Sequence, residues 1–499
     1  METKILSLSI PPEVSHVTET LKKADFKAFL VGGCVRDILL NKEPKDWDVT
    51  TDATPKEIIK LFEHTFYENK YGTVGIVNEN TPNERLKVVE VTPFRTESTY
   101  TDKRRPDAVA FSKNIEDDLK RRDFTINAIA LDIEPQGSCF TGNVVDLFGG
   151  LKDLSNGIIR TVGGADERLS EDALRIMRAV RLSAELSFTI EKETLEALKT
   201  HAPLLSHIAK ERIRDEFVRI IMSDTPMNAL ILSHELGILP FIAPELEEGL
   251  GVTQNQAHAY DVWEHLLRTV QHSADKKYSL EIRLTALFHD IGKPKTRRFS
   301  RETNQYTFYG HEVVGARMTE KILKNLNFPT KTIHDVVKLV RWHMFFSDTE
   351  QITLSAVRRM VANVGKDHIW DLMNVRVCDR IGTGRPKENP YRLRKYKAMV
   401  EEALRDPVSV GMLKINGSRM MEVANMPPNP KVGFILHALL EEVLEDPKLN
   451  TAEYLESKAV ELSKLGEKEL KALGEEGKER KAQAEEEEVS KIRGKHGVQ

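Results

Sequence analysis

The sequence contains little cysteine and no long apolar run. Its three cysteines, Cys34, Cys139 and Cys378, are far apart and lack CxxC spacing, which argues against a disulfide framework and a zinc knuckle. Nothing approaches the run of about 18 apolar residues that crosses a membrane, and the first residues lack the apolar stretch of a secretory signal. These absences predict a cytoplasmic protein, in a reducing compartment, without a membrane contact.

A strong excess of either charge is also missing. The 73 lysines and arginines and the 77 aspartates and glutamates give a net charge of −4 over 499 residues. A globally basic nucleic-acid coat is therefore excluded, although RNA binding needs only a local basic stripe. At this length one hydrophobic core is not enough, and we expect roughly three or four domains.

A glycine pair follows the first predicted strand. Residues 29–31 are apolar and end at Gly32 and Gly33, where backbone N–H groups can approach a bulky anion closely. Arg36 lies in the first turn of the predicted helix that follows, so its guanidinium and the helix N-terminus would face the same anion. The pattern indicates a phosphate site, although a GG turn alone is usually structural.

Two carboxylates come next. Asp46 and Asp48 are two residues apart in a predicted strand, so their side chains should share one face. Neighbouring carboxylates repel each other unless a divalent cation lies between them, and oxygen ligands beside a triphosphate favour Mg²⁺. We expect Trp47, on the other face, to lie in the core. Thr54 and Glu57 form a capping box that predicts the start of the next helix.

Further strands of a small mixed sheet are predicted at residues 71–77 and 86–91. Glu90 lies on the second of them, where a third carboxylate could complete a two-metal site. The polar segment between Phe94 and Phe111 has little periodicity and predicts a loop.

Two charged motifs follow. In RRDFTIN, Arg122 is the candidate for a triphosphate or base contact, and Asp123 and Asn127 are candidates for positioning; a salt-bridged turn is the alternative. After Ser170, a typical N-cap, a largely apolar helix is predicted. The helix carries an arginine every third residue, and these guanidinium groups need anions or acceptors to face; the arginines are Arg175, Arg178 and Arg181. The alternative here is a simple Asp172–Arg175 helix pair.

In this order, GGxVRD, DxD, RRDFT and EDxxR resemble the head of the nucleotidyltransferase superfamily, specifically the class II CCA-adding tRNA nucleotidyltransferase and bacterial poly(A) polymerase family. The resemblance implies an α+β fold, with a small mixed-sheet head followed by an all-α neck, body and tail. It implies that Asp46 and Asp48 are catalytic and hold Mg²⁺. It also implies a flexible loop before Phe111 that is needed for adding the terminal A, and KERIRDEF at residues 210–217 is expected to brace the neck.

In this family the aspartate and the arginine of EDxxR read the incoming base. Cytosine and adenine both offer an exocyclic amine beside a ring-nitrogen acceptor, so Asp172 could accept from the amine while Arg175 donates to the ring nitrogen. Uracil and guanine present the inverse pattern, which would leave both protein groups unpaired.

A second set of metal-ligand residue types begins near residue 255. Any single histidine on an apolar helix is usually a core residue, but an adjacent His-Asp pair with further histidines and a downstream aspartate is more specific. The set resembles an HD phosphohydrolase domain, in which Mn, Fe, Ni or Co suits imidazole and carboxylate ligands better than Mg. Its members are His265, His289, Asp290, His311, His343 and Asp379. A nearby basic cluster could hold RNA phosphates, namely Lys293, Lys295, Arg297 and Arg298.

The predicted domains are a catalytic head at 1–150, a neck at 151–250, an HD domain at 251–400, a tRNA-binding helical tail at 401–461 and a charged segment at 462–499. The expected activity is addition of CCA to tRNA from CTP and ATP, with phosphohydrolysis of RNA ends as a second activity and no DNA partner. One alternative is an A-adding enzyme or a poly(A) polymerase, although the GRRF-like segment usual in the latter is replaced by KYGTVGIV. The other is an HD phosphohydrolase with a vestigial head.

Overall fold

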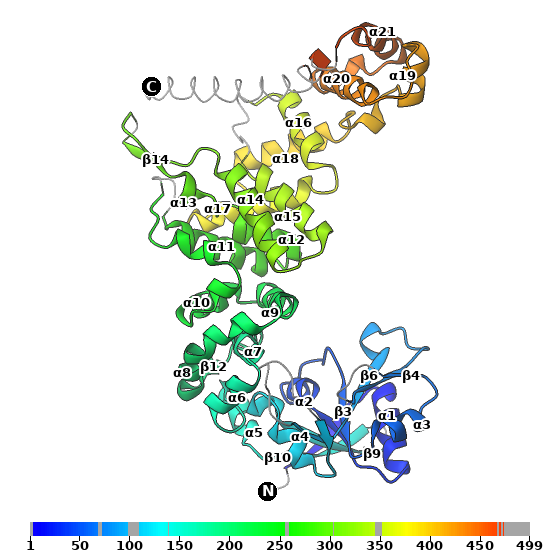
Figure 1. The fold of residues 1–499 in the computed structure, drawn as a ribbon, viewed down its shortest axis with the longest axis vertical. Helices are drawn as coiled ribbons and strands as arrows, with labels where there is room; N and C mark the ends of the chain where they lie inside the picture. The colour runs from blue at the N-terminus through cyan, green and yellow to red at the C-terminus, as the bar shows by residue number, and fades with distance from the viewer. Residues whose placement is uncertain are drawn as a thin grey trace. The chain divides into compact units, whose positions relative to one another are not determined.

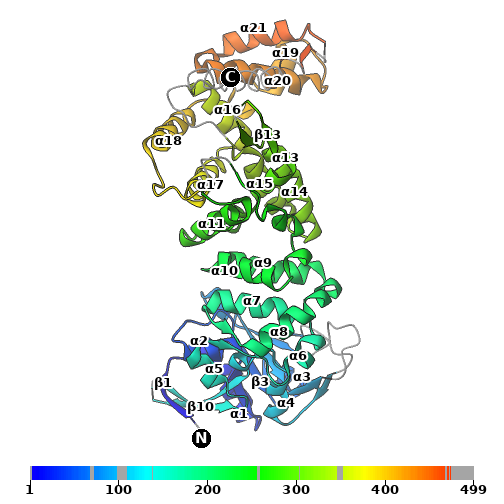
Figure 2. The same ribbon diagram turned by 90° about the vertical axis from the view of Figure 1, so that its left-hand side faces the viewer.

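A computed structural model of the chain describes residues 3–67, 72–97, 109–137, 139–254, 259–302, 304–344, 352–466, 469–470 and 473. The chain forms two compact units, Met1–Ala243 and Pro244–Gln499, which are described separately (Figures 1 and 2). The first unit contains a mixed sheet followed by helices, and the second is mostly helical. The predicted α+β class is therefore confirmed.

Among the described residues, the first unit contains an eight-stranded sheet in the order β1-β10-β9-β2-β3-β6-β5-β4. Its strands are β1 (Thr3–Leu8), β2 (Ala28–Val31), β3 (Asp48–Thr51), β4 (Thr65–Tyr67), β5 (Val74–Val77), β6 (Val88–Pro93), β9 (Ile129–Gln136) and β10 (Cys139–Asp146). Strands β3 and β6 are parallel, whereas β2 and β5 flank them in antiparallel orientation. Because β3 and β6 are parallel neighbours, residues near the start of β3 and of β6 lie side by side at the same edge of the sheet.

Several local predictions around the sheet are confirmed. The apolar run before the glycines is β2, and the helix after them is α2 (Gly33–Leu39). Helix α3 (Pro55–Leu61) begins with both halves of the predicted capping box. Trp47 is 5% exposed and belongs to the core between the sheet and its helices.

Other local predictions are wrong. Before the first predicted strand lies α1 (Pro12–Lys23), and before α1 lies β1, which was not predicted and pairs with β10 at the sheet edge. Asp46 does not share a strand with Asp48, because β3 begins at Asp48 and Asp46 lies exposed in the preceding bend. The hairpin of β9 and β10 was not predicted. The first three residues of β9 are all buried, so this strand lacks the alternating burial of a half-buried strand.

The predicted loop between Phe94 and Phe111 starts and ends as paired strands. These are β7 (Arg95–Glu97) and β8 (Val109–Phe111), with Arg95 opposite Phe111. Residues 98–108, which contain most of the segment expected to be needed for adding A, lie outside the described residues.

The remaining elements of the first unit are helices with short strands between them. They are α4 (Ile115–Lys120), α5 (Gly150–Asn156), β11 (Ile158–Ile159), α6 (Ala165–Glu171), α7 (Leu174–Leu186), β12 (Thr189–Ile190), α8 (Lys192–His201), α9 (Lys210–Met222) and α10 (Pro226–Glu235). Ser170 is not the N-cap of the arginine helix, because it lies inside α6. The Asp172 carboxylate instead accepts the Leu174 backbone N–H at 3.0 Å, at the start of α7.

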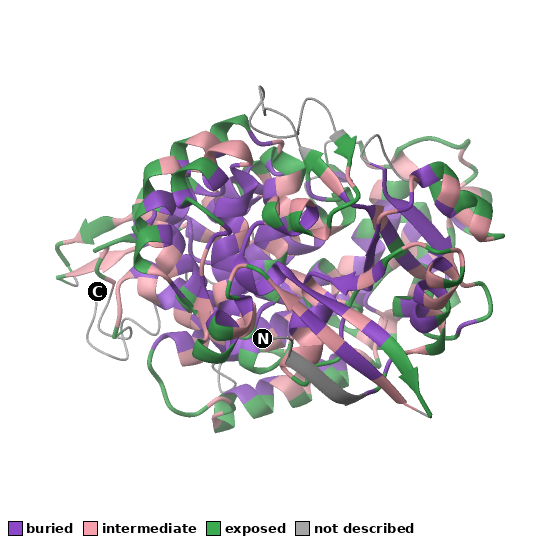
Figure 3. Ribbon diagram, turned by 90° about the horizontal axis from the view of Figure 1, so that it is seen from below, coloured by how far each residue is buried: buried purple, intermediate pink, exposed green. Residues whose placement is uncertain are grey.

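In its described residues, the second unit is a helical assembly with one strand pair, β13–β14. Its elements are α11 (Val262–Asp275), α12 (Leu280–Phe288), α13 (Lys293–Thr296), β13 (Arg298–Ser300), β14 (Gln305–Thr307), α14 (His311–Asn325), α15 (Thr330–Trp342), α16 (Leu354–Val364), α17 (Ile369–Gly382), α18 (Tyr391–Ala403), α19 (Gly417–Val423), α20 (Lys431–Glu445) and α21 (Ala452–Leu462). On α20, Ile435, Leu439 and Val443 recur every four residues and are fully buried, so this face packs into the core. Figure 3 shows the same inward concentration of buried residues across the helices.

The structure agrees with the absences noted in the sequence. All three cysteines are free, and Cys34 and Cys378 are buried. Within the described residues, no helix combines the length and the apolar character needed to cross a membrane. Most of the predicted charged segment at 462–499 lies outside the described residues.

Candidate active site and metal centre

The first candidate site lies where β2, β3 and β6 meet. Asp48 is in register with Glu90 across the parallel pair, so both side chains point to the same face of the sheet. The neighbours of Glu90 on its strand, Val89 and Val91, are fully buried on the other face. The structure therefore brings Asp48 and Glu90 together.

Gly32 lies directly against this pair. A Cβ atom on Gly32 would be 2.9 Å from Arg122 Nη1 and 3.6 Å from Asp48 Oδ2. Its φ of +81° with ψ of −134° is a conformation that essentially only glycine adopts. Its N–H donates to the Ile129 carbonyl at 3.4 Å, so the N–H of Gly33 remains the predicted backbone contact for phosphate.

The electrostatics of Asp48 suit a bound cation. Burial raises the pKa of its carboxyl above the usual range, Arg122 counteracts this effect, and Asp46 raises the pKa further. A divalent ion beside both carboxylates would offset burial and mutual repulsion together. The oxygen donors therefore fit the predicted metal.

A buried acid holds Arg122 in place. Asp118 on α4 is fully buried and accepts hydrogen bonds from Arg121 at 2.6 and 2.9 Å and from Arg122 at 3.1 Å. Because one carboxylate fixes both arginines, the guanidinium of Arg122 is oriented toward Gly32 and Asp48. Sequence reasoning missed Asp118, although its spacing of three and four residues from the two arginines is the signal of helical ion pairs.

Asp123 and Asn127 of RRDFTIN are buried and belong to a chain of hydrogen bonds that links Arg178 of α7 to Arg36 of α2. Asp123 accepts from Arg178 Nε at 2.7 Å and from Asn127 Nδ2 at 3.2 Å, and Asn127 Oδ1 accepts from Arg36 Nη1 at 2.8 Å. Arg36 also donates twice to Asp37. Burial acts to raise the pKa of Asp123, but Arg178 and the hydrogen bonds hold it well below its usual range. The guanidinium of Arg36 is thus bonded within the protein, and its contact with phosphate stays a prediction.

Asp172 and Arg175, the two residues predicted to read the incoming base, are close to each other but pair with different residues. Asp172 Oδ2 accepts from Arg212 Nη2 at 3.1 Å, which agrees with the bracing role expected for residues 210–217. Arg175 donates to Glu171 Oε2 at 2.6 Å and to the backbone carbonyls of Arg168 and Arg121 at 2.7 and 3.0 Å. The simple Asp172–Arg175 pair is therefore not the arrangement that the structure has.

The three arginines of α7 lie beside different acidic side chains. Arg175 faces Glu171 and Arg178 faces Asp123, whereas Arg181 lies 3.2 Å from Glu216 and 3.8 Å from Glu185. Burial lowers the pKa of the Arg181 guanidinium to about 10. The nucleotide contacts of Arg178 and Arg181 stay predictions.

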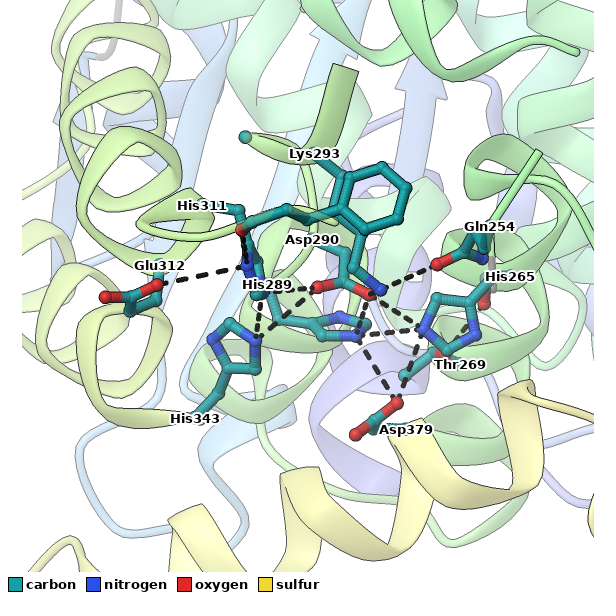
Figure 4. A network of polar contacts seen from close by, with 12 residues as sticks. Gln254, His265, Thr269, His289, Asp290, Lys293, His311, Glu312, His343 and Asp379 are labelled. Atoms are coloured by element: carbon teal, nitrogen blue, oxygen red, sulfur yellow. Dashed lines mark hydrogen bonds and ion pairs between the residues drawn. The ribbon is translucent and has the colours of Figure 1, made fainter. Parts of the chain in front are cut away.

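The second candidate site is a buried cluster of four histidines and two aspartates (Figure 4). Their ligand atoms form two groups, in each of which the atoms lie within 4.8 Å of one another. The first group is His265, His289 and Asp379, and the second is Asp290, His311 and His343. All six predicted residues converge, although five different helices or helix ends supply them.

Asp290 joins the two groups. Its Oδ2 lies 3.2 Å from His265 Nε2 and 3.3 Å from His289 Nε2, while its Oδ1 lies 3.1 Å from His311 Nε2 and 3.5 Å from His343 Nε2. One carboxylate thus faces donors of both groups, which is the geometry of a ligand that bridges two ions.

Backbone contacts fix the histidine rings. The Nδ1 atoms of His289, His311 and His343 lie 2.7–3.0 Å from the carbonyl oxygens three residues earlier. A proton on each Nδ1 satisfies these contacts and leaves the Nε2 lone pair directed at the centre. Burial acts to lower the pKa of both His289 and His343. At His289 the carboxylates of Asp290 and Asp379 outweigh it and raise the pKa to about 10, whereas the pKa of His343 falls to about 4. Positive charge is thus favoured at His289 and disfavoured at His343, and four imidazoles with two carboxylates form a donor set that fits a divalent metal.

Two cations lie beside the carboxylates of the centre. Lys293 Nζ is 2.5 Å from Asp290 Oδ2, and Arg376 Nη1 is 2.6 Å from Asp379 Oδ2. Lys293 also donates to Gln254 Oε1 at 2.6 Å and is buried, so its assignment to a basic cluster for RNA phosphates is wrong. Arg376 was missed, although it precedes Asp379 by one helical turn.

Comparison with known proteins identifies relatives of both sites. The family described as the poly A polymerase head domain matches residues 28–160, the probable RNA and SrmB-binding site of polymerase A matches residues 187–250, and the HD domain matches residues 262–366. A CCA-adding enzyme of Geobacillus thermodenitrificans is 31% identical over 455 residues, which are 91% of this chain and 97% of that protein.

A second curated relative and a solved structure also resemble this chain. A CCA-adding enzyme of Leuconostoc mesenteroides is 42% identical over 272 residues, 53% of this chain and 64% of that protein, and the chain spans about half of other such relatives. The solved structure of the Bacillus stearothermophilus CCA-adding enzyme in complex with CTP has a TM-score of 0.66 at 27% identity, covering 91% of this chain and 98% of that one.

Proposed function

The chain belongs to the family of CCA-adding enzymes, and from this premise we propose that it adds C, C and A to the 3′ end of tRNA from CTP and ATP without a nucleic-acid template. The observation that carries the proposal is the register of Asp48 with Glu90 beside Gly32 and Arg122. Carboxylates next to a phosphate-binding turn and an anchored arginine are what nucleotidyl transfer requires.

Each residue of the head site has a role in this reaction. Asp46, Asp48 and Glu90 would hold Mg²⁺, which supplies charge neutralisation and activates the attacking hydroxyl when bound. Gly33 and Arg122 hold the triphosphate. The RNA 3′ oxygen attacks the α-phosphorus, its proton passes to solvent, and the bond to the β-phosphate breaks to release pyrophosphate.

Base selection falls to Asp172 and Arg175. Among the described residues, Arg175 uses three of its five N–H groups on Glu171 and two carbonyls, which leaves donors for a ring nitrogen. Asp172 accepts two hydrogen bonds, and a carboxylate can accept about four. Both groups can therefore read cytosine or adenine while the surrounding contacts hold them in place.

One assay tests the activity. Purified protein is incubated with tRNA that ends at the discriminator base, at C or at CC, with labelled CTP or ATP. We expect C addition to the first two substrates and A addition to the third. Addition of A alone would indicate an A-adding enzyme, and long A tails would indicate a poly(A) polymerase; either result overturns the proposal.

Gly32→Ala should impair nucleotide addition beyond its effect on stability. The strained backbone should cost about 1–3 kcal/mol of unfolding free energy, and displacement of Arg122 should slow addition about a hundredfold. The matched control is Gly149→Ala, because Gly149 also has a positive φ of +77° but nothing lies within 4 Å of its added Cβ. The control should lose about 1 kcal/mol and keep its rate. Equal rates in the two variants would contradict the role of the Gly32 turn.

A second activity is favoured by the metal centre. Six converging donors with fixed histidine rings support a phosphohydrolase that uses Mn, Fe, Ni or Co. We infer that it opens cyclic phosphates or removes phosphates at damaged RNA ends. In the first case the oxygen of a water molecule attacks phosphorus and the bond from phosphorus to one ribose oxygen breaks. That ribose oxygen takes up a proton to become a hydroxyl, and the other ribose oxygen keeps the phosphate as a monoester.

A further inference from the structure

Between Asp290 and His311 the chain leaves the metal centre as the β13–β14 hairpin, which projects from the helices of the second unit (Figure 1). Both ends of this segment are fixed at the centre, because α13 begins three residues after Asp290 and α14 begins with His311. A Cβ atom on Gly292 would lie 2.3 Å from the His311 carbonyl oxygen, so the two ends are packed tightly together. The hairpin therefore begins and ends beside the donors.

Flat side chains contact one another along the hairpin. The Arg297 guanidinium carbon lies 3.6 Å from the centre of the Tyr306 ring, and the Phe299 ring meets Tyr306 edge to face at 5.4 Å and 71°. An isolated two-stranded hairpin is marginal in water, and these contacts brace it. Two aromatic side chains nevertheless stay open to solvent, Phe299 at 54% and Tyr309 at 68% exposure. Exposed aromatic rings offer flat faces on which unpaired bases stack.

The charge of the same segment is positive. Arg298 and Arg301 are exposed, and within the described part of the chain neither lies within ion-pair distance of an acidic side chain. Exposed aromatic faces with unneutralised guanidinium groups match a polyanion whose bases are unpaired. An RNA duplex hides its base faces by stacking, and an acidic protein segment offers few flat faces. Single-stranded RNA is therefore the partner that fits.

We propose that the β13–β14 hairpin binds the unpaired nucleotides at the 3′ end of an RNA and holds that end at the metal centre. Each three-residue strand spans about 10 Å, which matches about three stacked nucleotides at roughly 3.4 Å each. Binding itself needs no hydrolysis, and only the fate of the bound end rests on the proposed phosphohydrolase activity.

Binding is measured by fluorescence anisotropy with a labelled six-nucleotide single-stranded RNA and the full-length protein in a chelator, so that hydrolysis does not interfere. The double variant Phe299→Ala, Tyr309→Ala should bind at least about 25-fold more weakly, because removal of each of the two base–aromatic stacks weakens binding at least about fivefold. Phe299→Trp with Tyr309→Phe should restore binding. Tyr391→Ala is the matched control, since Tyr391 is 69% exposed and also lies beside an arginine, 6.0 Å from Arg394, but on α18.

The salt dependence of RNA binding distinguishes the contribution of base stacking from that of the positive charges. Arg298→Gln with Arg301→Gln should reduce the slope of log affinity against log salt concentration by about 0.7 for each phosphate that the protein no longer neutralises. The aromatic double variant should leave the slope unchanged. A blunt RNA duplex should bind equally to the aromatic variant and the unaltered protein.

Two results would overturn the proposal: unchanged binding of single-stranded RNA in the aromatic double variant, or equal weakening by Tyr391→Ala. Hydrolysis of a nucleoside 2′,3′-cyclic phosphate with added Mn²⁺ is measured separately. If the unaltered protein fails to hydrolyse it while the hairpin variants still lose RNA binding, the phosphohydrolase proposal is wrong and the hairpin site stands.

Discussion

Asp48→Asn should reduce the rate of CTP and ATP addition by about a thousandfold or more, while the protein stays folded. The substitution removes one of the three carboxylates that would hold Mg²⁺ at the reacting phosphate, and loss of such a group typically costs at least this factor. Initial rates with tRNA ending at C and at CC measure the effect, and Asp46→Ala should behave in the same way.

The stability of the Asp48→Asn variant should not fall with its activity. Because burial raises the pKa of Asp48 in the folded protein, its charged form is destabilising at neutral pH, and a neutral asparagine removes that penalty. The melting temperature in a chelator should therefore stay the same or rise. Asp52→Asn is the control, since Asp52 lies just beyond β3 and accepts the Lys27 backbone N–H. Full activity of Asp48→Asn, or loss of activity in the control, would refute the assignment.

Asp290→Asn should abolish phosphohydrolysis and leave CCA addition intact. Because Asp290 faces donors of both groups, its loss should empty both metal positions, and we expect hydrolysis to fall about a thousandfold or more. Metal content by elemental analysis and hydrolysis of a nucleoside 2′,3′-cyclic phosphate measure the change. A chelator should lower the melting temperature of the unaltered protein but not of the variant, because bound metal stabilises the folded state.

The chain offers a matched control for this experiment. Asp335 is also buried, and its Oδ1 lies 3.2 Å from His334 Nδ1 and 3.3 Å from His368 Nε2, yet it belongs to neither donor group. Asp335→Asn should therefore retain its metal and its hydrolysis. Normal metal content in Asp290→Asn would show that the two groups do not depend on the shared carboxylate.

Much of the fold was predictable because local signals were strong. The glycine turn and the capping box of Thr54 determine backbone geometry within a few residues, so β2, α2 and α3 were predicted correctly. Strand β1 was missed because an edge strand is defined by its partner β10, which lies more than a hundred residues away, and local periodicity carries no such information.

In the two candidate sites, too, some features could be predicted from local sequence and others could not. The residue types that hold metal could be recognised from sequence, and the six donors of the second unit converge as expected. The partners of the charged groups could not, because Arg212 reaches Asp172 and Arg178 reaches Asp123 across separate elements. Lys293 was misassigned for the same reason: its neighbours in sequence are basic, whereas its partner in space is Asp290.

The hydrogen-bonded chain of Arg178, Asp123, Asn127 and Arg36 also limits how this protein can diverge. Each member is the hydrogen-bonding partner of the next, and all but Arg178 are buried. Changing Arg178 alone therefore leaves the buried charge of Asp123 without its cation, at a cost of about 3–5 kcal/mol. An evolving lineage that altered these positions one at a time would pass through poorly folded intermediates. The four residues should therefore be inherited as a block, and their substitutions should show strong epistasis.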